Sequence, residues 1–561
     1  MKRTLLILVA IAAIGLVFVF AHSSKPENER ADFLPDLAPV GATLLDGLGD
    51  YSMPISSDHP GVQQWFDQAL TLTYGFNHDA AERSYLKAAE LDPECAMCWW
   101  GAALVLGPHV NAAMDPANNE AAFERLQAAQ ALAPKASERE QAYIRALSAR
   151  YIADPPEDRT PLDQAYAEAM AELAREYPDD LDAATLHAEA MMNLQPWDFW
   201  EEDGSPKGQT PQIVAVLESV MARDPSHAGA LHLYIHAVEA SDEPERGAAA
   251  ADRLRGLIPG SGHLVHMPAH IYARVGRWQD AVEVNQDAIK SDDAYLAACR
   301  PAPGVYPLGY VPHNHHFLWF AATMIGDRAT ALAAAEGTAE HTSDPELMRA
   351  PGLEFTQNFA STPMLAHVRF GMWEEVSQAP KPDDDLPYMN AVWHYAQAMA
   401  ALRAEEFDEA EQYYAALQAL SGDPAIAELL WLGRYPLSLG IGVAERLVAG
   451  ELAAANGNYD EAISALREGA HLEDQIPYDE PPGWHHPVRQ TLGAVLLEAD
   501  RADEAEAAYR EELRRNPENG WSLFGLEQAL LAQDRQDEAA EIRERFEAAW
   551  TGDIRLTASR F

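Results

Sequence analysis

The stretch Val62–Pro93, VQQWFDQALTLTYGFNHDAAERSYLKAAELDP, decides the fold. Counted from Val62, places 4, 8, 20, 24, 27 and 32 hold Trp65, Ala69, Ala81, Tyr85, Ala88 and Pro93. Small residues at places 8, 20 and 27 let two antiparallel helices approach closely, and large residues at places 4 and 24 fill the gaps between them. Proline at place 32 ends the second helix. The stretch therefore predicts a hairpin of two helices.

The same pattern returns along the chain at intervals of about 34 residues. A unit that starts at His486 repeats it at places 8, 20, 24 and 32, with Gly493, Ala505, Tyr509 and Pro517. The predicted units start near Val62, Ala96, Ala136, Leu181, Ala228, Gly262, Pro312, Gln357, Ala391, Val443, His486 and Gly520. This spacing resembles the tetratricopeptide repeat (TPR) family over nearly everything after residue 60. The resemblance implies an all-α fold, an α-solenoid of about twelve helical hairpins that forms a right-handed superhelix.

The charge of the chain excludes some partners. Lys and Arg number 40 against 88 Asp and Glu, for a formal net charge of −48. A surface this acidic argues against nucleic acid or an anionic membrane as the partner of the folded part. The acidic residues are spread through helical patterns, which is typical of a solvated outer surface.

The N-terminal residues predict export. Lys2 and Arg3 precede an uncharged run that ends in Ala21-His22-Ser23, so residues 1–23 are read as a signal peptide or a signal anchor. Residues 24–60 follow as a polar tether. We therefore expect a periplasmic or extracytoplasmic protein, secreted or held to the membrane only through this segment. The repeats divide into residues 61–227 with a CxxC motif, 228–345 rich in histidine, and 346–561.

Cysteine is scarce, with only Cys95, Cys98 and Cys299. Cys95-x-x-Cys98 is compatible with a local disulfide, a soft-metal pair, or two ordinary residues at a helix start. With His78 and His109 nearby in the chain, the two cysteines form a second, weaker candidate metal site. Trp99 follows the motif instead of histidine, so c-type haem attachment is unsupported.

Three segments carry an excess of histidine: His232–Ser241 (HLYIHAVEAS), Gly262–Trp278 (GHLVHMPAHIYARVGRW) and Tyr310–Trp319 (YVPHNHHFLW). On the repeat frame, places 2, 5 and 9 of the first helix face the inner groove. Histidine fills seven of these nine places over three units, and Glu239 takes place 12. The predicted metal ligands are His232, His236, His263, His266, His270, His313, His316 and Glu239.

The chemistry of imidazole favours a transition metal. Two histidines at i and i+4 on one helix can share a cation, and neutral imidazole suits Cu or Zn first, with Fe or Ni as alternatives. Seven histidines are enough for one or two ions. Glu239 fits as a ligand, as the partner of a ligand, or as a base. Pro268 lies inside the predicted helix, which predicts a kink or a later helix start.

Three insertions interrupt the repeat spacing, at Gly107–Asn119, Leu194–Thr210 and Ala294–Val311. Loops of this length in a compact array are typically functional or disordered. The last two flank the histidine units, so we interpret them as lids.

The histidine strings, together with NGWSLFGL at Asn519–Leu526, are similar to those of a group of exported bacterial TPR proteins. This resemblance implies a fold and a location, and no activity. Two functions stay open: a metalloprotein, acting as an enzyme or as a metal carrier, and an envelope scaffold whose groove binds a peptide or a partner protein.

Overall fold

The computed structural model describes residues 41–561, and this part of the chain is all-α apart from one short antiparallel strand pair. The strands are β1 (Leu430–Trp431) and β2 (Tyr435–Pro436). The predicted signal or anchor at residues 1–23 and the first part of the predicted tether lie outside the described residues. Among the described helices, none combines the length and the apolar character that a membrane crossing requires.

The chain divides into two compact units. Unit 1 comprises Met1–Ile271, described from residue 41 onward, and Gln286–Pro307; unit 2 comprises Tyr272–Asn285 and Leu308–Phe561. Two helices run from one unit into the other, α13 (Pro268–Arg274) and α14 (Trp278–Cys299).

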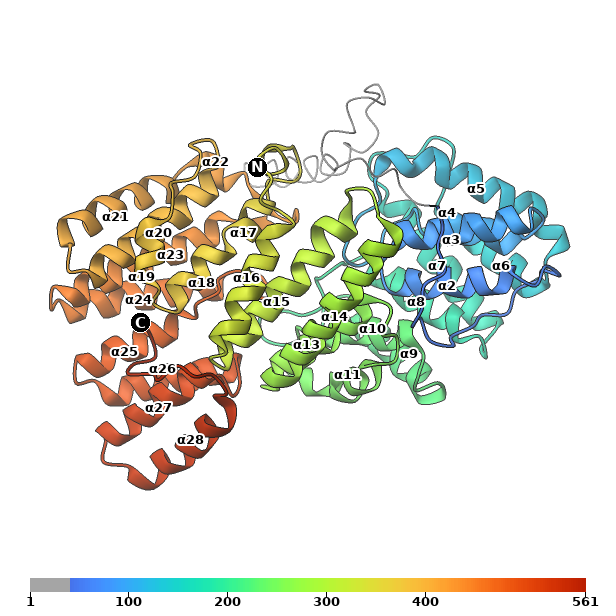
Figure 1. Cartoon of the computed structure of the whole chain (residues 1–561). Coiled ribbons are helices and arrows are strands. Elements are labelled where there is room, and N and C mark those ends of the chain that lie inside the picture. The colour runs from blue at the N-terminus through green and yellow to red at the C-terminus, as the bar shows by residue number, and fades with distance from the viewer. Residues whose placement is uncertain (1–40) are drawn as a thin grey trace, which may run out of the picture. The chain divides into compact units, whose positions relative to one another are not determined.

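Unit 1 is built from consecutive helices that pack in pairs (Figure 1). They are α2 (Val62–Tyr74), α3 (His78–Leu91), α4 (Ala96–Leu104), α5 (Asn119–Leu132), α6 (Glu138–Leu147), α7 (Thr160–Glu176), α8 (Leu181–Met192), α9 (Thr210–Arg223), α10 (Ala228–Val238), α11 (Ala248–Leu254) and α12 (Gly262–His266). Short 3₁₀ turns join some of them, at Pro116–Asn118, Ala133–Lys135 and Pro244–Gly247.

After a π-helical turn at Tyr306–Tyr310, unit 2 is also built from consecutive helices that pack in pairs. Its helices are α15 (Val311–Met324), α16 (Arg328–Glu340), α17 (Thr356–Ala360), α18 (Thr362–Arg369), α19 (Trp373–Gln378), α20 (Pro387–Arg403), α21 (Phe407–Ser421), α22 (Pro424–Ala427), α23 (Ser438–Ala455), α24 (Tyr459–Asp474), α25 (Val488–Glu498), α26 (Ala502–Arg515), α27 (Gly520–Ala532) and α28 (Gln536–Ala549). A 3₁₀ turn lies at Leu347–Arg349.

The pairing of small with large residues holds the hairpins together, as the repeat pattern predicts. A Cβ atom added at Gly101 would lie 2.2 Å from the ring of Tyr85, and one at Gly493 would lie 2.3 Å from the ring of Tyr509. Both tyrosines are fully buried. The predicted array of helical hairpins is confirmed, and the insertions at 107–119 and 194–210 fall between the two helices of their hairpins.

Residues 41–60, the described part of the predicted tether, contain no helix or strand and pack along unit 1. Leu48 and Met53 are buried. The backbone N–H of Leu45 donates to the Gln68 side chain at 2.8 Å, and the N–H of Gly260 donates to the carbonyl of Gly47 at 2.8 Å. This part of the segment is therefore a packed strap on unit 1.

Unit 1 also has a contact that an open solenoid lacks, because α10 packs against α2 as well as against its neighbours α8, α9 and α11. In a simple repeat array each unit touches only the next. The contact brings the C-terminal end of α2 and the loop after it to the face of α10 that carries histidine.

Candidate metal centre

Two helical segments of unit 1 supply the histidine cluster. Helix α10 is buried over its whole length and carries His232 and His236 one turn apart, with Glu239 at its C-cap. Helix α12 carries His263 and His266, and His270 follows in α13. The helix breaks at Met267, and Pro268 starts α13, where proline costs no internal hydrogen bond. The predicted disturbance at Pro268 is thus a break between two short helices.

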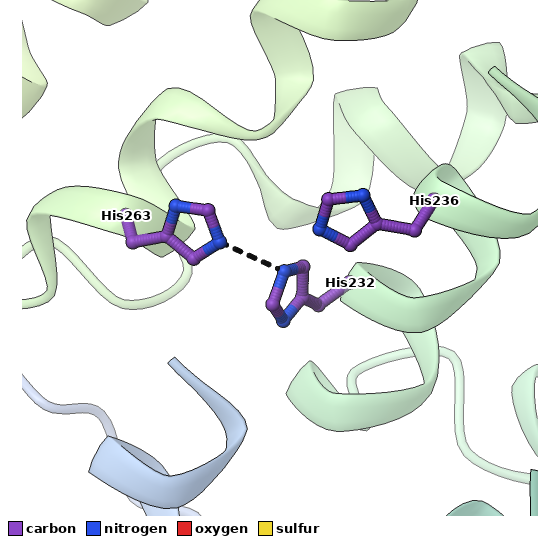
Figure 2. Close-up of side chains that lie close together, drawn as sticks. All are labelled: His232, His236 and His263. Atoms are coloured by element: carbon purple, nitrogen blue, oxygen red, sulfur yellow. Dashed lines mark hydrogen bonds between the residues drawn. The ribbon is translucent and has the colours of Figure 1, made fainter. Parts of the chain in front are cut away.

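Three of these imidazoles face one another (Figure 2). Nε2 of His263 lies 3.1 Å from Nε2 of His232. One ring nitrogen from each of His232, His236 and His263 falls within 4.8 Å of the others. Two nitrogens bound to one tetrahedral ion, each at 2.0–2.1 Å, lie ~3.3 Å apart. The separation of the His232 and His263 nitrogens is therefore close to that of ligands sharing an ion.

Hydrogen bonds at the opposite ring nitrogens fix which atoms face the cluster. Nδ1 of His232 donates to the backbone carbonyl of Tyr74 at 2.6 Å, and Nδ1 of His236 donates to Oε1 of Glu239 at 2.8 Å. Both rings therefore present an unprotonated Nε2 to the shared space in their neutral form. Carboxylate and carbonyl partners of this kind orient metal-binding histidines and raise their basicity.

The Nε2 atom of His236 is buried and has no hydrogen-bond partner within residues 41–561. An unsatisfied buried polar atom costs about 1–3 kcal/mol, and native proteins rarely leave one without a reason. A cation held between the three rings would satisfy this lone pair.

Burial keeps the three imidazoles neutral. Desolvation lowers the pKa of His232 and His263 well below 6.5, and neighbouring imidazoles lower both pKa values further. Desolvation also lowers the pKa of His236, although Glu239 opposes the shift. A neutral imidazole is the form that binds metal, so the site favours a cation over protons.

Glu239 connects this group to a second histidine pair. Its Oε2 accepts from Nδ1 of His270 at 2.5 Å, while Oε1 accepts from His236. Burial alone would raise the pKa of Glu239, but His270 and His236 together outweigh it and lower the pKa to about 2. Glu239 is thus an ionised carboxylate that orients two imidazoles. Beyond it, Nε2 of His266 lies 2.7 Å from Nε2 of His270.

Aromatic side chains from loops surround the cluster. The ring of Phe76, in the loop after α2, lies 4.5 Å from that of His232 and stacks on His109 at 4.4 Å. Trp197, in the insertion at 194–210, meets the ring of His236 edge-on at 5.3 Å. Trp200 of the same insertion donates to the carbonyl of Ala237 at 2.8 Å. The insertion therefore covers α10, consistent with the interpretation as a lid.

The third insertion reaches the cluster through Tyr306. Its hydroxyl accepts from the backbone N–H of His263 at 3.3 Å and donates to Oδ1 of Asp292 at 2.8 Å. Sequence reasoning missed Tyr306, Asp292 and Phe76 as supports of the site. The insertion at 294–311, interpreted as a lid from its length and position, was the one signal that pointed toward Tyr306.

The second candidate site does not form as predicted. Cys95 and Cys98 are joined by a disulfide, within an apolar cluster that includes Val62 and Ala88. Their sulfurs are bonded to each other, so neither is a thiolate ligand. His78 and His109 face each other with ring centroids 4.6 Å apart, and Nδ1 of His78 lies 2.8 Å from the carbonyl of Val105. Burial lowers the pKa of His78 to about 4.

His313 and His316 belong to unit 2. The ring of His316 packs between aromatic side chains, 5.2 Å from Trp319 and 5.3 Å from Phe359. Burial lowers the pKa of His316 to about 3. His313 meets the ring of Phe317 edge-on at 6.1 Å. The ligands that unit 1 itself brings together are His232, His236 and His263, with His266, His270 and Glu239 adjoining them.

Comparisons with known proteins add a likeness in fold. No protein-family model matches the chain, and no curated protein matches it either. Solved structures of helical repeat proteins are similar at low identity. The Cut9-Hcn1 hetero-tetramer of APC/C is 14% identical with a TM-score of 0.31, covering 85% of this chain and 76% of that chain. The human IFIT1 dimer with m7Gppp-AAAA is 13% identical with a TM-score of 0.31, covering 88% and 91%.

Yeast Tom70 is 12% identical with a TM-score of 0.25, covering 86% of this chain and 92% of that chain. Likeness at these TM-scores carries no argument about function. The fold assignment rests on the paired helices and on the small-to-large packing within them: the chain is a TPR-like array of helical hairpins.

Proposed function

We propose that this protein binds a transition-metal ion through Nε2 of His232, His236 and His263. The observation that carries the proposal is the Nε2 atom of His236, which is buried without a hydrogen-bond partner in the described chain. One ring nitrogen of His236 lies within 4.8 Å of a ring nitrogen from each of the other two histidines, and Figure 2 shows the three rings turned toward one another. Cu or Zn is the expected metal, with Fe or Ni as alternatives, because neutral imidazole suits these ions.

Burial favours metal over the alternative of a peptide-binding groove. The side chains of His232, His236 and His263 are at most 1% exposed. Residues that read a peptide must be reachable from solvent, whereas a metal site gains from a dry, preformed shell. The alternative function, a protein-binding scaffold, then rests only on the general ability of TPR-like arrays to bind proteins elsewhere on their surface.

We also propose that the protein works outside the cytoplasm. The Cys95–Cys98 disulfide supports this location, since structural disulfides persist mainly in oxidising compartments. The predicted export segment at residues 1–23 agrees with it. Cell fractionation, with N-terminal sequencing of the mature protein, tests the proposal; recovery in the cytoplasm with an intact N-terminus contradicts it.

Metal analysis of protein purified without a histidine tag tests the metal site. Elemental analysis is expected to find bound Cu, Zn, Fe or Ni, or to find it after reconstitution. The variant H232A/H236A/H263A is expected to lose this metal. H471A is the matched control, because His471 is exposed and bonds only to Gln475 within the described chain.

Two results would overturn the proposal. One is wild-type protein that takes up far less than one ion per chain even after reconstitution. The other is a triple variant that keeps its metal while circular dichroism shows a native helical spectrum. If the triple variant fails to fold, the single variant H236N replaces it, since asparagine removes the Nε2 ligand with a smaller loss of volume.

A further inference from the structure

We infer that unit 1 binds a second metal ion beside the first, on His266 and His270, and that the two ions form one dinuclear centre linked by Glu239. The inference rests on the proposed function, because it takes the His232, His236 and His263 site as the first position. It adds a second metal position, and it assigns a class of small ligand to the centre.

The first support is the geometry of the second pair. Nε2 of His266 and Nε2 of His270 lie 2.7 Å apart, and both side chains are buried. Nδ1 of His270 donates to Glu239, so Nε2 of His270 carries a lone pair. In the metal-free chain His266 donates its Nε2 proton to that lone pair. A cation that displaces this proton gains two nitrogens already turned toward each other.

The second support is the arrangement of the two rings across the helix break. In one regular helix, side chains at i and i+4 project from the same face in the same direction. Here the chain breaks at Met267 and restarts at Pro268. The rings of His266 and His270 meet at an interplanar angle of 79° with centroids 4.7 Å apart. The two rings therefore converge even though the helix is interrupted between them.

The third support is the closeness of the two histidine groups. The rings of His263 and His266 have centroids 6.1 Å apart, and those of His236 and His270 lie 5.8 Å apart. Glu239 orients one ligand of each group through its two oxygens. Two-metal centres hold their ions about 3.5–4 Å apart. Glu239 bonds to the Nδ1 atoms, on the far side of each ring from Nε2, so it orients both groups without contacting either ion.

The number of histidine ligands indicates which kind of further ligand completes the metal centre. An ion at the first position has three nitrogen ligands, so its remaining coordination positions lie beyond these histidines. Open positions distinguish reactive metal sites from closed structural ones. We expect these positions to take a small oxygen donor, namely water, hydroxide or a carboxylate, which bridges the two ions.

Copper titration of the full chain tests the inference. Electron paramagnetic resonance is expected to show an isolated Cu(II) signal at the first equivalent. At the second equivalent, spin coupling is expected to broaden or remove that signal. Elemental analysis is expected to give two ions per wild-type chain and one in H266N/H270N, whose signal stays isolated. H471N is the control that keeps two ions, because His471 is exposed and bonds only to Gln475 within the described chain.

The outcomes separate this inference from the proposed function. One ion per chain in wild type and in H266N/H270N overturns the second position and leaves the first intact. Two ions in wild type with no spin coupling overturn the dinuclear centre. No metal in wild type overturns both. If H266N/H270N fails to fold, the wild-type titration alone decides the question.

Discussion

The backbone carbonyl of Tyr74 accepts a hydrogen bond from Nδ1 of His232 at 2.6 Å, across 158 residues of sequence. The phenol of the same tyrosine donates to Oδ1 of Asp182 at 2.6 Å. Tyr51, on the strap formed by residues 41–60, also donates to Asp182, at 2.5 Å. The end of α2 is thus held by hydrogen bonds through both its backbone and its side chain. The carbonyl of Tyr74 also keeps the proton of neutral His232, a predicted metal ligand, on Nδ1.

Gly229, in α10, packs directly against the ring of Tyr74, the last residue of α2. A Cβ atom at Gly229 would lie 2.5 Å from the ring of Tyr74. We expect G229A to destabilise the protein by roughly 1–3 kcal/mol, as overpacking does, and to weaken metal binding by displacing Tyr74. Denaturant unfolding and metal titration measure the two effects. G442A is the control, since its Cβ would make only ordinary contact at 3.7 Å; equal behaviour of the two variants would contradict the prediction.

Glu239 orients imidazoles on both sides, so E239Q is expected to weaken metal binding. The amide has one acceptor oxygen, and its NH₂ group cannot accept from the second Nδ1–H. Loss of such a partner typically costs roughly 10–100-fold in metal affinity. Competition with a chelator of known affinity measures the change. E218Q, on the neighbouring helix α9, is the control, because within the described chain Glu218 accepts only from the hydroxyl of Tyr234 and from Arg246; a similar loss there would argue against the role of Glu239.

The insertion at 194–210 is pinned to α10 by the indole of Trp200. W200F removes its hydrogen bond to Ala237, and we expect a loss of about 1 kcal/mol in the free energy of unfolding. We also expect faster release of metal to a chelator, since the loop that covers His236 loosens. W99F is the control, because its indole nitrogen lies 3.5 Å from its acceptor at the surface. Unchanged release from W200F would mean that the insertion does not limit exchange.

The cysteine pair is expected to stabilise the fold without binding metal. Alkylation of denatured, unreduced protein should label Cys299 alone, and reduction should expose all three cysteines of the chain. By the chain-entropy relation, closing so short a loop contributes roughly 2 kcal/mol. C95S/C98S is therefore expected to lower the melting temperature and to keep its metal. If this variant stays folded but loses its metal, the cysteines are metal ligands after all and the prediction is wrong.

Stability should fall with rising pH because of two buried carboxyl groups in unit 2. Burial and the charge of Glu512 raise the pKa of Glu473 to about 8, and burial raises the pKa of Glu512 to about 7. The folded chain therefore holds protons that the unfolded chain loses near its ordinary value of 4.5. This contribution to stability is full below pH 4.5 and is lost as the pH rises to about 8.

Urea unfolding of wild type at pH 6 and pH 8 measures this loss, and E473Q is expected to reduce the difference between the two pH values. E428Q, at an exposed position, is expected to behave like wild type. A pH dependence that is the same in E473Q and wild type would contradict the assignment to this pair.

The fold was predictable because, in a repeat protein, the spacing of small and large residues along the sequence reflects how neighbouring helices pack. Gly101 against Tyr85 and Gly493 against Tyr509 are contacts between neighbouring helices, and the small-to-large pattern predicts such contacts directly. The facing of His232, His236 and His263 followed from the same periodicity. Residue spacing predicts only contacts between helices that are neighbours in the sequence. The contact between α2 and α10 joins hairpins far apart in the chain, so it could not be predicted in this way.

The remaining parts of the site come from outside the repeat. Phe76 and Tyr306 lie in connecting segments, which have no fixed place on the repeat frame. His316 takes place 5 of its predicted repeat unit, as His232 and His266 do in theirs. Its ring nevertheless packs against Trp319 and Phe359 in unit 2. The frame predicts which side of a helix a residue faces, whereas the identity of the facing partner depends on the surrounding tertiary packing.

Unit 1 is discontinuous, since it needs Gln286–Pro307 as well as the chain up to Ile271. Tyr306 bonds the backbone of His263, and Tyr295 bonds Asn77 at the start of the unit. A ribosome must therefore complete residue 307 before the nascent chain can finish this half, and we expect the proposed metal to load only after both segments are made. A truncation after Pro307 keeps unit 1 whole, but only together with Tyr272–Asn285, which belongs to unit 2.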